Sequence, residues 1–127
     1  EINDEIVIAG RADVRATNGY IRKTTEELLK NVDKDKYIIL ADHQPVEAKE
    51  NAKSGVDMQL SGHTHAGQFF PLTIVQPLAY QNYWGHLKVD DMHTYVTSGI
   101  GIYGPKLRMF TDSEIMQIEL RFTEEKE

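Results

Sequence analysis

The sequence contains no cysteine, which excludes disulfide bonds, thiolate metal sites and cysteine nucleophiles. Clustered basic residues are also missing: 14 lysines and arginines are scattered among 20 acidic residues, for a net charge of −6. Phosphate backbones need clustered positive charge, so a general nucleic-acid binder is excluded. No apolar run approaches the roughly 20 residues of a membrane span. What remains is 127 residues with 40% hydrophobic content, enough for one soluble domain with its own core.

Short apolar runs, separated by turn residues and polar segments, predict an α/β chain. Strands are expected at 6–9, 37–41, 58–60, 94–97 and 115–122. A helix is expected at 24–31, which opens with Thr-Thr-Glu-Glu, and another at 46–53, which follows Pro45 and stops at Ser54-Gly55. Residues 69–85 are aromatic and rich in turn residues.

Three histidines follow two of these strands. The strand at 37–41, the helix at 46–53 and the strand at 58–60 lie within about 25 residues and predict a βαβ unit with parallel strands. The carboxyl ends of parallel strands point to the same edge of the sheet, where open α/β sheets bind their ligands. We therefore expect His43, His63 and His65 to converge on one rim.

Neutral imidazoles are good ligands for ions of the Mn, Fe and Zn class, and Asp42 is a weak candidate for orienting one of them by a hydrogen bond. The alternative is a chance His-x-His in a loop, which the convergence with His43 disfavours. Asp91-Met92-His93 also has a ligand-like spacing, but it precedes a strand and is interpreted as a turn. His86 is interpreted as a surface or packing residue.

Other residues admit both a structural and a functional interpretation. Arg108 could contact a phosphate oxygen, but its proximity to Asp112 and Glu114 favours a structural ion pair. Asp13 follows a strand end, so it is a candidate for the rim and equally for a turn carboxylate. The aromatic residues at 80, 83 and 84 could line a substrate pocket, although packing is the commoner role of such a cluster.

At the histidines the chain resembles the calcineurin-like metallophosphoesterases, whose last two signature blocks are a lone histidine after a strand and a Gly-His-x-His. It is most similar to a bacterial branch with the pattern GVDLxLSGHTHGGQ, which reads GVDMQLSGHTHAGQ at residues 55–68. Ala66 in place of glycine is the notable departure. Residues 95–101 (YVTSGIG), Arg108 and the turn at 9–13 also fit the branch, so the resemblance spans nearly the whole chain.

The resemblance implies a four-layer α/β/β/α sandwich with mixed sheets and a site with two divalent ions that hydrolyses phosphate monoesters or diesters. In it His43 and His63 would bind one ion and His65 the other. The family's earlier blocks, which supply an Asp-x-His before these histidines, a Gly-Asp-x-x-Asp and a Gly-Asn-His with the catalytic histidine, do not occur in these residues. We therefore expect residues 1–127 to be the C-terminal part of a metallophosphoesterase domain, with the N-terminal half and the catalytic histidine outside this chain.

On this hypothesis the isolated chain is inactive, holds metal weakly or not at all, and exposes an apolar sheet edge or face that favours homodimerisation. The chain alone is expected to be soluble, and the intact protein to be cytoplasmic or anchored to a membrane. The alternative is a non-catalytic or single-metal-binding module that acts through a partner interface.

Overall fold

A mixed five-stranded sheet organises the chain, with strand order β1-β2-β3-β5-β4. The computed structural model describes residues 1–2, 4–15, 19 and 21–122. The elements are β1 (Ile6–Gly10), α1 (Thr25–Leu28), β2 (Tyr37–Ala41), α2 (Ala48–Lys53), β3 (Met58–Ser61), the 3-10 helix η1 (His65–Gly67), α3 (Leu72–Ala79), β4 (Gly85–Val89) and β5 (Met92–Val96). Four strands run parallel, and β4 pairs antiparallel with β5. This mixed α/β sheet confirms the predicted fold class.

The strands and helices predicted in the first half of the chain all form, although both helices are shorter than predicted. The side chain of Thr24 accepts a hydrogen bond from the Glu27 backbone, and the Glu27 carboxylate accepts one from the Thr24 backbone, so α1 begins with a capping box. The same helix is shorter than predicted and ends at Leu28. Helix α2 ends before Gly55, whose φ of +84° suits glycine better than any other residue.

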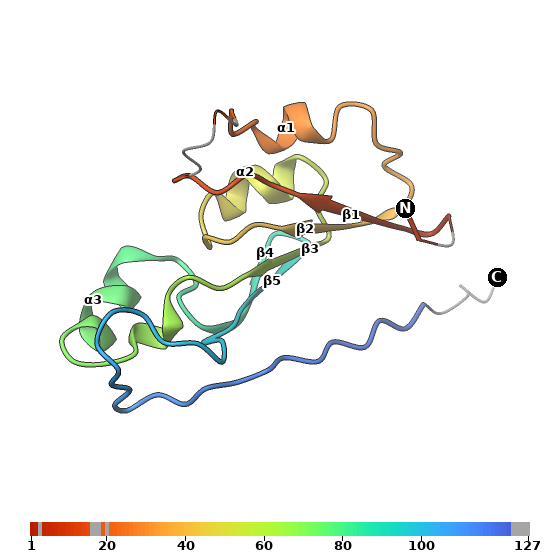
Figure 1. Ribbon diagram of the computed structural model, residues 1–127. Helices are drawn as coiled ribbons and strands as arrows, with labels where there is room; N and C mark the ends of the chain where they lie inside the picture. Colours follow the sequence, from red (N-terminus) through yellow and green to blue (C-terminus); the bar gives the residue numbers. More distant parts are fainter. Residues whose placement is uncertain (3, 16–18, 20, 123–127) are drawn as a thin grey trace.

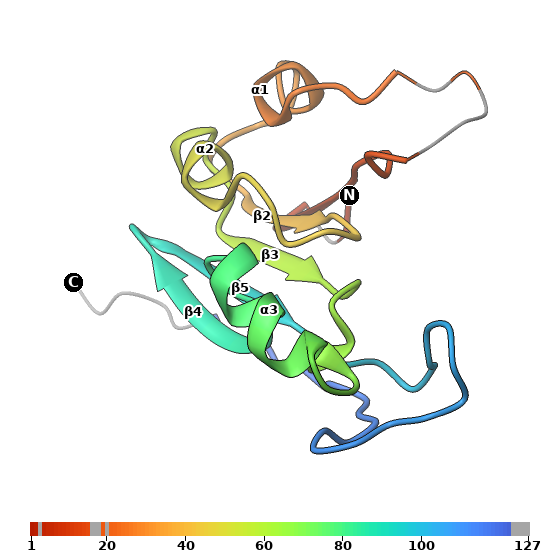
Figure 2. The ribbon, with the colours of Figure 1, turned by 90° about the vertical axis from the view of Figure 1, so that its left-hand side faces the viewer.

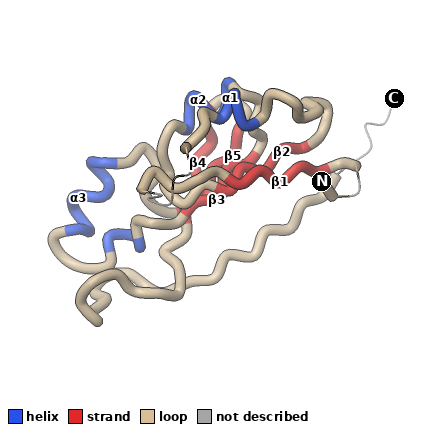
Figure 3. Tube along the Cα trace, turned by 45° about the horizontal axis from the view of Figure 1, so that its top comes forward, coloured by secondary structure: helices blue, strands red, loops and turns tan. Residues whose placement is uncertain are grey.

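The predicted βαβ unit is confirmed, since β2 and β3 pair in parallel with Ile39 opposite Met58. Helices α1 and α2 cover one face of the sheet (Figures 1 and 3). Between them and the strands lies the apolar core: Val7, Ala9, Leu29, Ile38, Leu40, Val56, Val89 and Met92. Because β2 and β3 are anchored by this core, their carboxyl ends are held side by side at one edge.

Three elements in the second half were not predicted: the short η1 and two longer ones. Residues 72–79 form α3 although Pro77 lies inside the helix, and residues 85–89 form β4. Asp91 lies in the turn between β4 and β5, as predicted, and His93 belongs to β5. His86 stacks on His93 and on Tyr95, which confirms a packing role for that histidine.

The prediction of a strand at 115–122 is wrong for this structure. The segment is extended and runs along the sheet on the side opposite α1 and α2 (Figure 1), but it belongs to no strand. A strand needs a neighbour with which to form a hydrogen-bond ladder, and no described strand pairs with it. Its side chains still contact the sheet, as the ring of Phe122 lies 5.8 Å from that of Tyr37. The alternating pattern therefore indicates an extended segment, which has no partner strand among the described residues.

The face of the sheet opposite α1 and α2 is incompletely covered. Ile8 of β1 is 53% exposed, and Ile115 of the extended segment is 84% exposed. This agrees with the expected apolar face, while homodimerisation itself stays a prediction. Within the part of the chain that the structure describes, no helix has the length and apolar character needed to cross a bilayer.

Candidate metal centre

Two of the three predicted histidines meet at the carboxyl edge of the sheet. His43 follows β2 and His63 follows β3, and the Gly62 backbone N–H donates to the His43 carbonyl at 3.0 Å. The rings lie edge to face, with 3.3 Å between His43 Nε2 and His63 Nδ1. The parallel pairing of β2 and β3 is therefore what brings residues twenty positions apart into contact.

The distance between these nitrogens fits joint ligation of one ion. At a metal–nitrogen distance of about 2.0–2.1 Å, two tetrahedral ligands have nitrogens roughly 3.3 Å apart. Without an ion the same pair can share an N–H···N hydrogen bond. Among the described residues no group of three or more His, Asp or Glu side chains is arranged to hold a metal ion. His43 and His63 can therefore supply two ligands of a site that needs others.

His65 lies at the same cavity but in a different environment. Its ring stacks on Tyr103 at 6.5 Å, and its Nδ1 is buried without a hydrogen-bond partner among the described residues. A buried, unpartnered imidazole nitrogen is costly unless a ligand engages it. This nitrogen thus fits a metal ligand that is separate from the His43–His63 pair.

The backbone around these histidines is strained. Positive φ angles occur at four residues that are not glycine, namely His63, His65, Ala66 and Gln68, with values of 69°, 51°, 51° and 47°. Ala66 is the position where the resembled branch has glycine, which adopts this conformation without penalty. Such strain persists only where the surroundings enforce it, and it clusters at functional sites.

Burial, and then the neighbouring His43, lower the pKa of His63, which keeps its imidazole neutral and free to donate a lone pair near neutral pH. Asp13 lies beside the pair, with its Oδ2 4.0 Å from His43 Nε2. Its Oδ1 accepts the Arg15 backbone N–H at 2.7 Å, which lowers the pKa of the carboxyl. Asp13 is therefore both a rim residue and a turn carboxylate.

A cavity of about 580 Å³ opens beside the histidines. It is lined by Asp13, Arg15, His43, Gln44, His63, Thr64, His65, Gln68, Leu72, Gln76, Tyr80 and Tyr103. Tyr80 lies here, with its ring 6.4 Å from that of His63. Leu72 and Gln76 come from α3, where the prolines at 71 and 77 hid the helical pattern. Gln44 could have been found, because it directly follows His43.

Asp42 occupies a different place from the one expected for a residue that orients an imidazole. Its buried carboxylate accepts two hydrogen bonds from Arg22, at 2.7 and 3.1 Å, and one from Arg11 at 3.4 Å. Among the described residues it bonds to no histidine. This carboxylate in turn raises the pKa of Arg22. Asp42, at the end of β2, therefore holds Arg11 and Arg22, which both follow β1 in the chain, next to that strand end.

Arg108 binds backbone carbonyls and, among the described residues, does not form the predicted ion pair. Its guanidinium donates to backbone carbonyls, including that of Gly101 at 2.8 Å, that of Asp112 at 3.1 Å and that of His65 at 3.4 Å. No described carboxylate forms a salt bridge with it. A planar guanidinium with five donors suits this task, and it holds the loop after β5 against the histidine turn.

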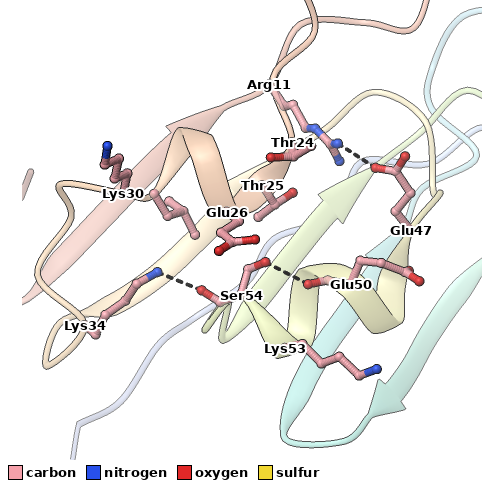
Figure 4. A pocket seen from close by; sticks show the side chains of 11 residues that line it. Arg11, Thr24, Thr25, Glu26, Lys30, Lys34, Glu47, Glu50, Lys53 and Ser54 are labelled. Carbon is pink, nitrogen blue, oxygen red and sulfur yellow. Dashed lines mark hydrogen bonds and ion pairs between the residues drawn. The ribbon is translucent and has the colours of Figure 1, made fainter.

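A larger hollow, of about 910 Å³, lies between α1 and α2 (Figure 4). Its lining mixes basic residues with acidic ones, and Arg11 pairs there with Glu47. None of the predicted ligands lines it. The histidine cavity, although smaller, is therefore the better candidate for chemistry.

Gly67 offers a test of the packing behind the histidines. A Cβ added there would lie 2.6 Å from Thr73 Cα, at a φ of +82°. We expect Gly67→Ala to lower the free energy of unfolding by roughly 3 kcal/mol, from the clash together with the left-handed backbone. Gly101→Ala, where nothing lies within 4 Å of the added Cβ, is the control and should change it by less than about 0.5 kcal/mol. Equal urea midpoints for the two variants would contradict this packing.

The chain is similar in sequence to several known proteins. A protein of Aquifex aeolicus named an uncharacterized metallophosphoesterase is 35% identical over 125 residues, covering 95% of this chain and 48% of its own length. A zebrafish transmembrane protein with metallophosphoesterase domain is 46% identical over 88 residues, covering 66% of this chain and 20% of its own. A Helicobacter pylori metallophosphoesterase is 39% identical over 97 residues, 75% of this chain and 26% of its own. No family model and no solved structure matches the chain.

The sheet and its rim define an α/β domain that gathers histidines at the carboxyl ends of parallel strands. The chain belongs to the metallophosphoesterase family, as relatives that cover most of it show. It spans between about one fifth and one half of the length of the three relatives described above.

Proposed function

We propose that the intact protein is a metal-dependent phosphoesterase whose centre includes His43, His63 and His65. The observation that supports this most is the pair of imidazole nitrogens 3.3 Å apart at the carboxyl edge of the sheet. Two divalent ions of the Mn, Fe or Zn class would supply a water of lowered pKa and polarise the phosphate oxygens. His43 and His63 would hold one ion, and His65, with its unpartnered Nδ1, the other.

The side chains of this cavity have their own tasks in the proposed reaction. The lowered pKa of His63 keeps it a neutral ligand, so that it need not lose a proton to bind metal. Asp13 Oδ2 lies 4.0 Å from His43 Nε2, the nitrogen that also faces His63, so its carboxylate lies on the ion's side of the ring and would add negative charge beside a bound cation. Tyr80 and Tyr103 flank the histidines and line that side of the cavity. The substrate is a phosphate monoester or diester.

We further propose that the remaining ligands and the catalytic histidine come from sequence outside these 127 residues. The absence of Gly-Asp-x-x-Asp and Gly-Asn-His from the chain supports this, as does its partial coverage of the relatives. The isolated chain is then inactive. Of the two locations expected for the intact protein, cytoplasmic or membrane-anchored, the name of the zebrafish relative favours the membrane anchor.

A second candidate is a non-catalytic module that binds a single ion and acts through a partner. The convergence of just two of the three predicted histidine ligands, His43 and His63, favours it. The two candidates differ in turnover: the module would bind metal without hydrolysing any phosphate ester.

Removing the metal tests the proposal. Chelation of the intact protein is expected to abolish hydrolysis of an aryl phosphate or of an aryl phosphodiester, because the water then keeps its ordinary pKa. Manganese added back should restore the rate, and magnesium at the same concentration is the matched control for ionic strength. Hydrolysis that survives exhaustive chelation would contradict a metal-dependent reaction, and the absence of any turnover would favour the binding module.

A further inference from the structure

Gln68 is a buried glutamine whose side chain binds a loop far along the chain. It directly follows η1 and is 1% exposed. Its Nε2 donates to the Tyr103 and Leu107 carbonyls at 2.7 and 3.0 Å, and its Oε1 accepts the Tyr103 backbone N–H at 2.6 Å. The Gln68 carbonyl also accepts the Met109 N–H at 2.8 Å. This one residue therefore binds the loop at 103–109 near both of its ends.

Hydrogen bonds hold this loop in place, because regular structure does not. Residues 97–122 contain no helix and no strand. Figures 1 and 2 show the loop, in blue, beyond the end of β5. Tyr103 is 64% exposed, so burial contributes little to its position. An amide with two N–H donors and one carbonyl acceptor matches the two loop carbonyls and the one loop N–H that Gln68 binds.

The ring of Tyr103 lies against His65. The ring centroids are 6.5 Å apart and the ring planes differ by 25°, which is within the range of offset stacking. The Nδ1 of His65 is buried without a hydrogen-bond partner among the described residues, so no hydrogen bond to that atom orients the imidazole. The contact with Tyr103 therefore restricts the rotation of the His65 ring.

We propose that Gln68 is a positioning residue for His65. By holding the backbone of Tyr103, it keeps the Tyr103 ring against the imidazole and so fixes the orientation in which His65 binds an ion. This rests on the proposed function, in which His65 holds one ion and the His43–His63 pair holds another. Among the described residues the Gln68 side chain bonds to no histidine. Its loss should therefore weaken the ion of His65 and spare the other ion.

Gln68→Met in the intact protein tests this proposal, because methionine keeps the length of the side chain but makes none of these hydrogen bonds. The first measurement is the NMR spectrum of the metal-free protein with labelled histidines. A displaced Tyr103 ring changes the ring current at His65, so we expect the His65 ring signals to shift and those of His43 to stay. The second is a manganese titration, in which we expect one ion to bind about 10- to 100-fold more weakly and the other as in the wild type.

Gln59→Met is the matched control. Gln59 is also a buried glutamine, 0% exposed, but its side chain bonds to Asn51 and Ser61 and not to the loop. This variant should lower the free energy of unfolding, because it too removes buried hydrogen bonds. It should leave the His65 ring signals and the affinity for both ions at the wild-type level.

Tyr103→Leu is a second variant, which keeps the backbone hydrogen bonds to Gln68 and removes only the ring. Because Tyr103 is largely exposed, this change does not disturb a core. It should shift the His65 signals and weaken the same ion as Gln68→Met does. Should Gln68→Met not fold, this variant alone decides.

The outcomes separate the positioning role from the proposed function. Unmoved His65 signals in Gln68→Met or in Tyr103→Leu would overturn the proposal, and so would equal shifts in Gln68→Met and Gln59→Met. An equal loss of both ions in Gln68→Met would also overturn it, because it would show a general effect on the fold. His65 signals that move in both loop variants, in a protein that hydrolyses no phosphate ester, would support the positioning role and count against the phosphoesterase.

Discussion

Replacing His63 with alanine is expected to lower metal-dependent hydrolysis by the intact protein at least about 100-fold. Loss of a residue that merely orients a metal ligand costs about 10- to 100-fold, so loss of a ligand should cost no less. His63 is one of two imidazoles whose nitrogens lie 3.3 Å apart, and its removal leaves His43 as the one imidazole of that pair. The measurement is kcat/KM for an aryl phosphate in saturating manganese, together with the metal content of each purified protein.

His86→Ala is the matched control for this experiment. His86 is exposed on β4 and stacks on His93, away from the cavity that contains His63. Its loss should leave both turnover and metal content at the wild-type level. Undiminished activity of His63→Ala would refute the assignment. A similar loss in both variants would point to a general effect on folding, and circular dichroism would reveal it.

Replacing Asp42 with asparagine is expected to lower the free energy of unfolding by about 3 kcal/mol or more. The substitution keeps the size of the side chain but removes the charge that two arginines share. The Asp42 side chain is 0% exposed, and those of Arg11 and Arg22 are 5% and 15% exposed. Breaking a buried ion pair from one side leaves uncompensated charge, which typically costs 3–5 kcal/mol. Urea denaturation of the purified chain measures the change.

Glu47→Gln provides the comparison. Glu47 also pairs with Arg11, but its side chain is 47% exposed, so water replaces much of the lost interaction. We expect a loss below about 1 kcal/mol for this variant. If both variants lowered the free energy of unfolding equally, burial of Asp42 would not determine how strongly its ion pairs with the arginines stabilise the fold.

The local elements of the first half follow directly from sequence patterns. The strand at 37–41 and the helix that ends before Gly55 were predicted because a continuous apolar run, a preceding proline and a C-terminal glycine act within a few residues. The same patterns located the edge at which His43 and His63 meet, since a βαβ crossover fixes the direction of both strands. The proposed ligands could therefore be named before their distance was known.

Elements whose stability depends on distant contacts were harder to predict. Helix α3 forms around Pro77, against its local propensity, and contacts η1. The segment 115–122 has the alternation of a strand, yet it has no strand to pair with among the described residues. In both cases local propensity and tertiary context disagree, and the structure follows the tertiary context.

The sequence by itself determined the family, the parallel βαβ unit and the edge where the histidines gather, because motifs and strand direction are local properties of the chain. Only the tertiary structure decided that Asp42 pairs with arginines, that Tyr80 and Tyr103 flank the histidines, and that α3 turns its apolar side outward. Those arrangements depend on which segments meet across the fold. Distance and burial in the folded protein decide which side chains interact when they are far apart in the chain, and neither quantity follows from their spacing in the sequence.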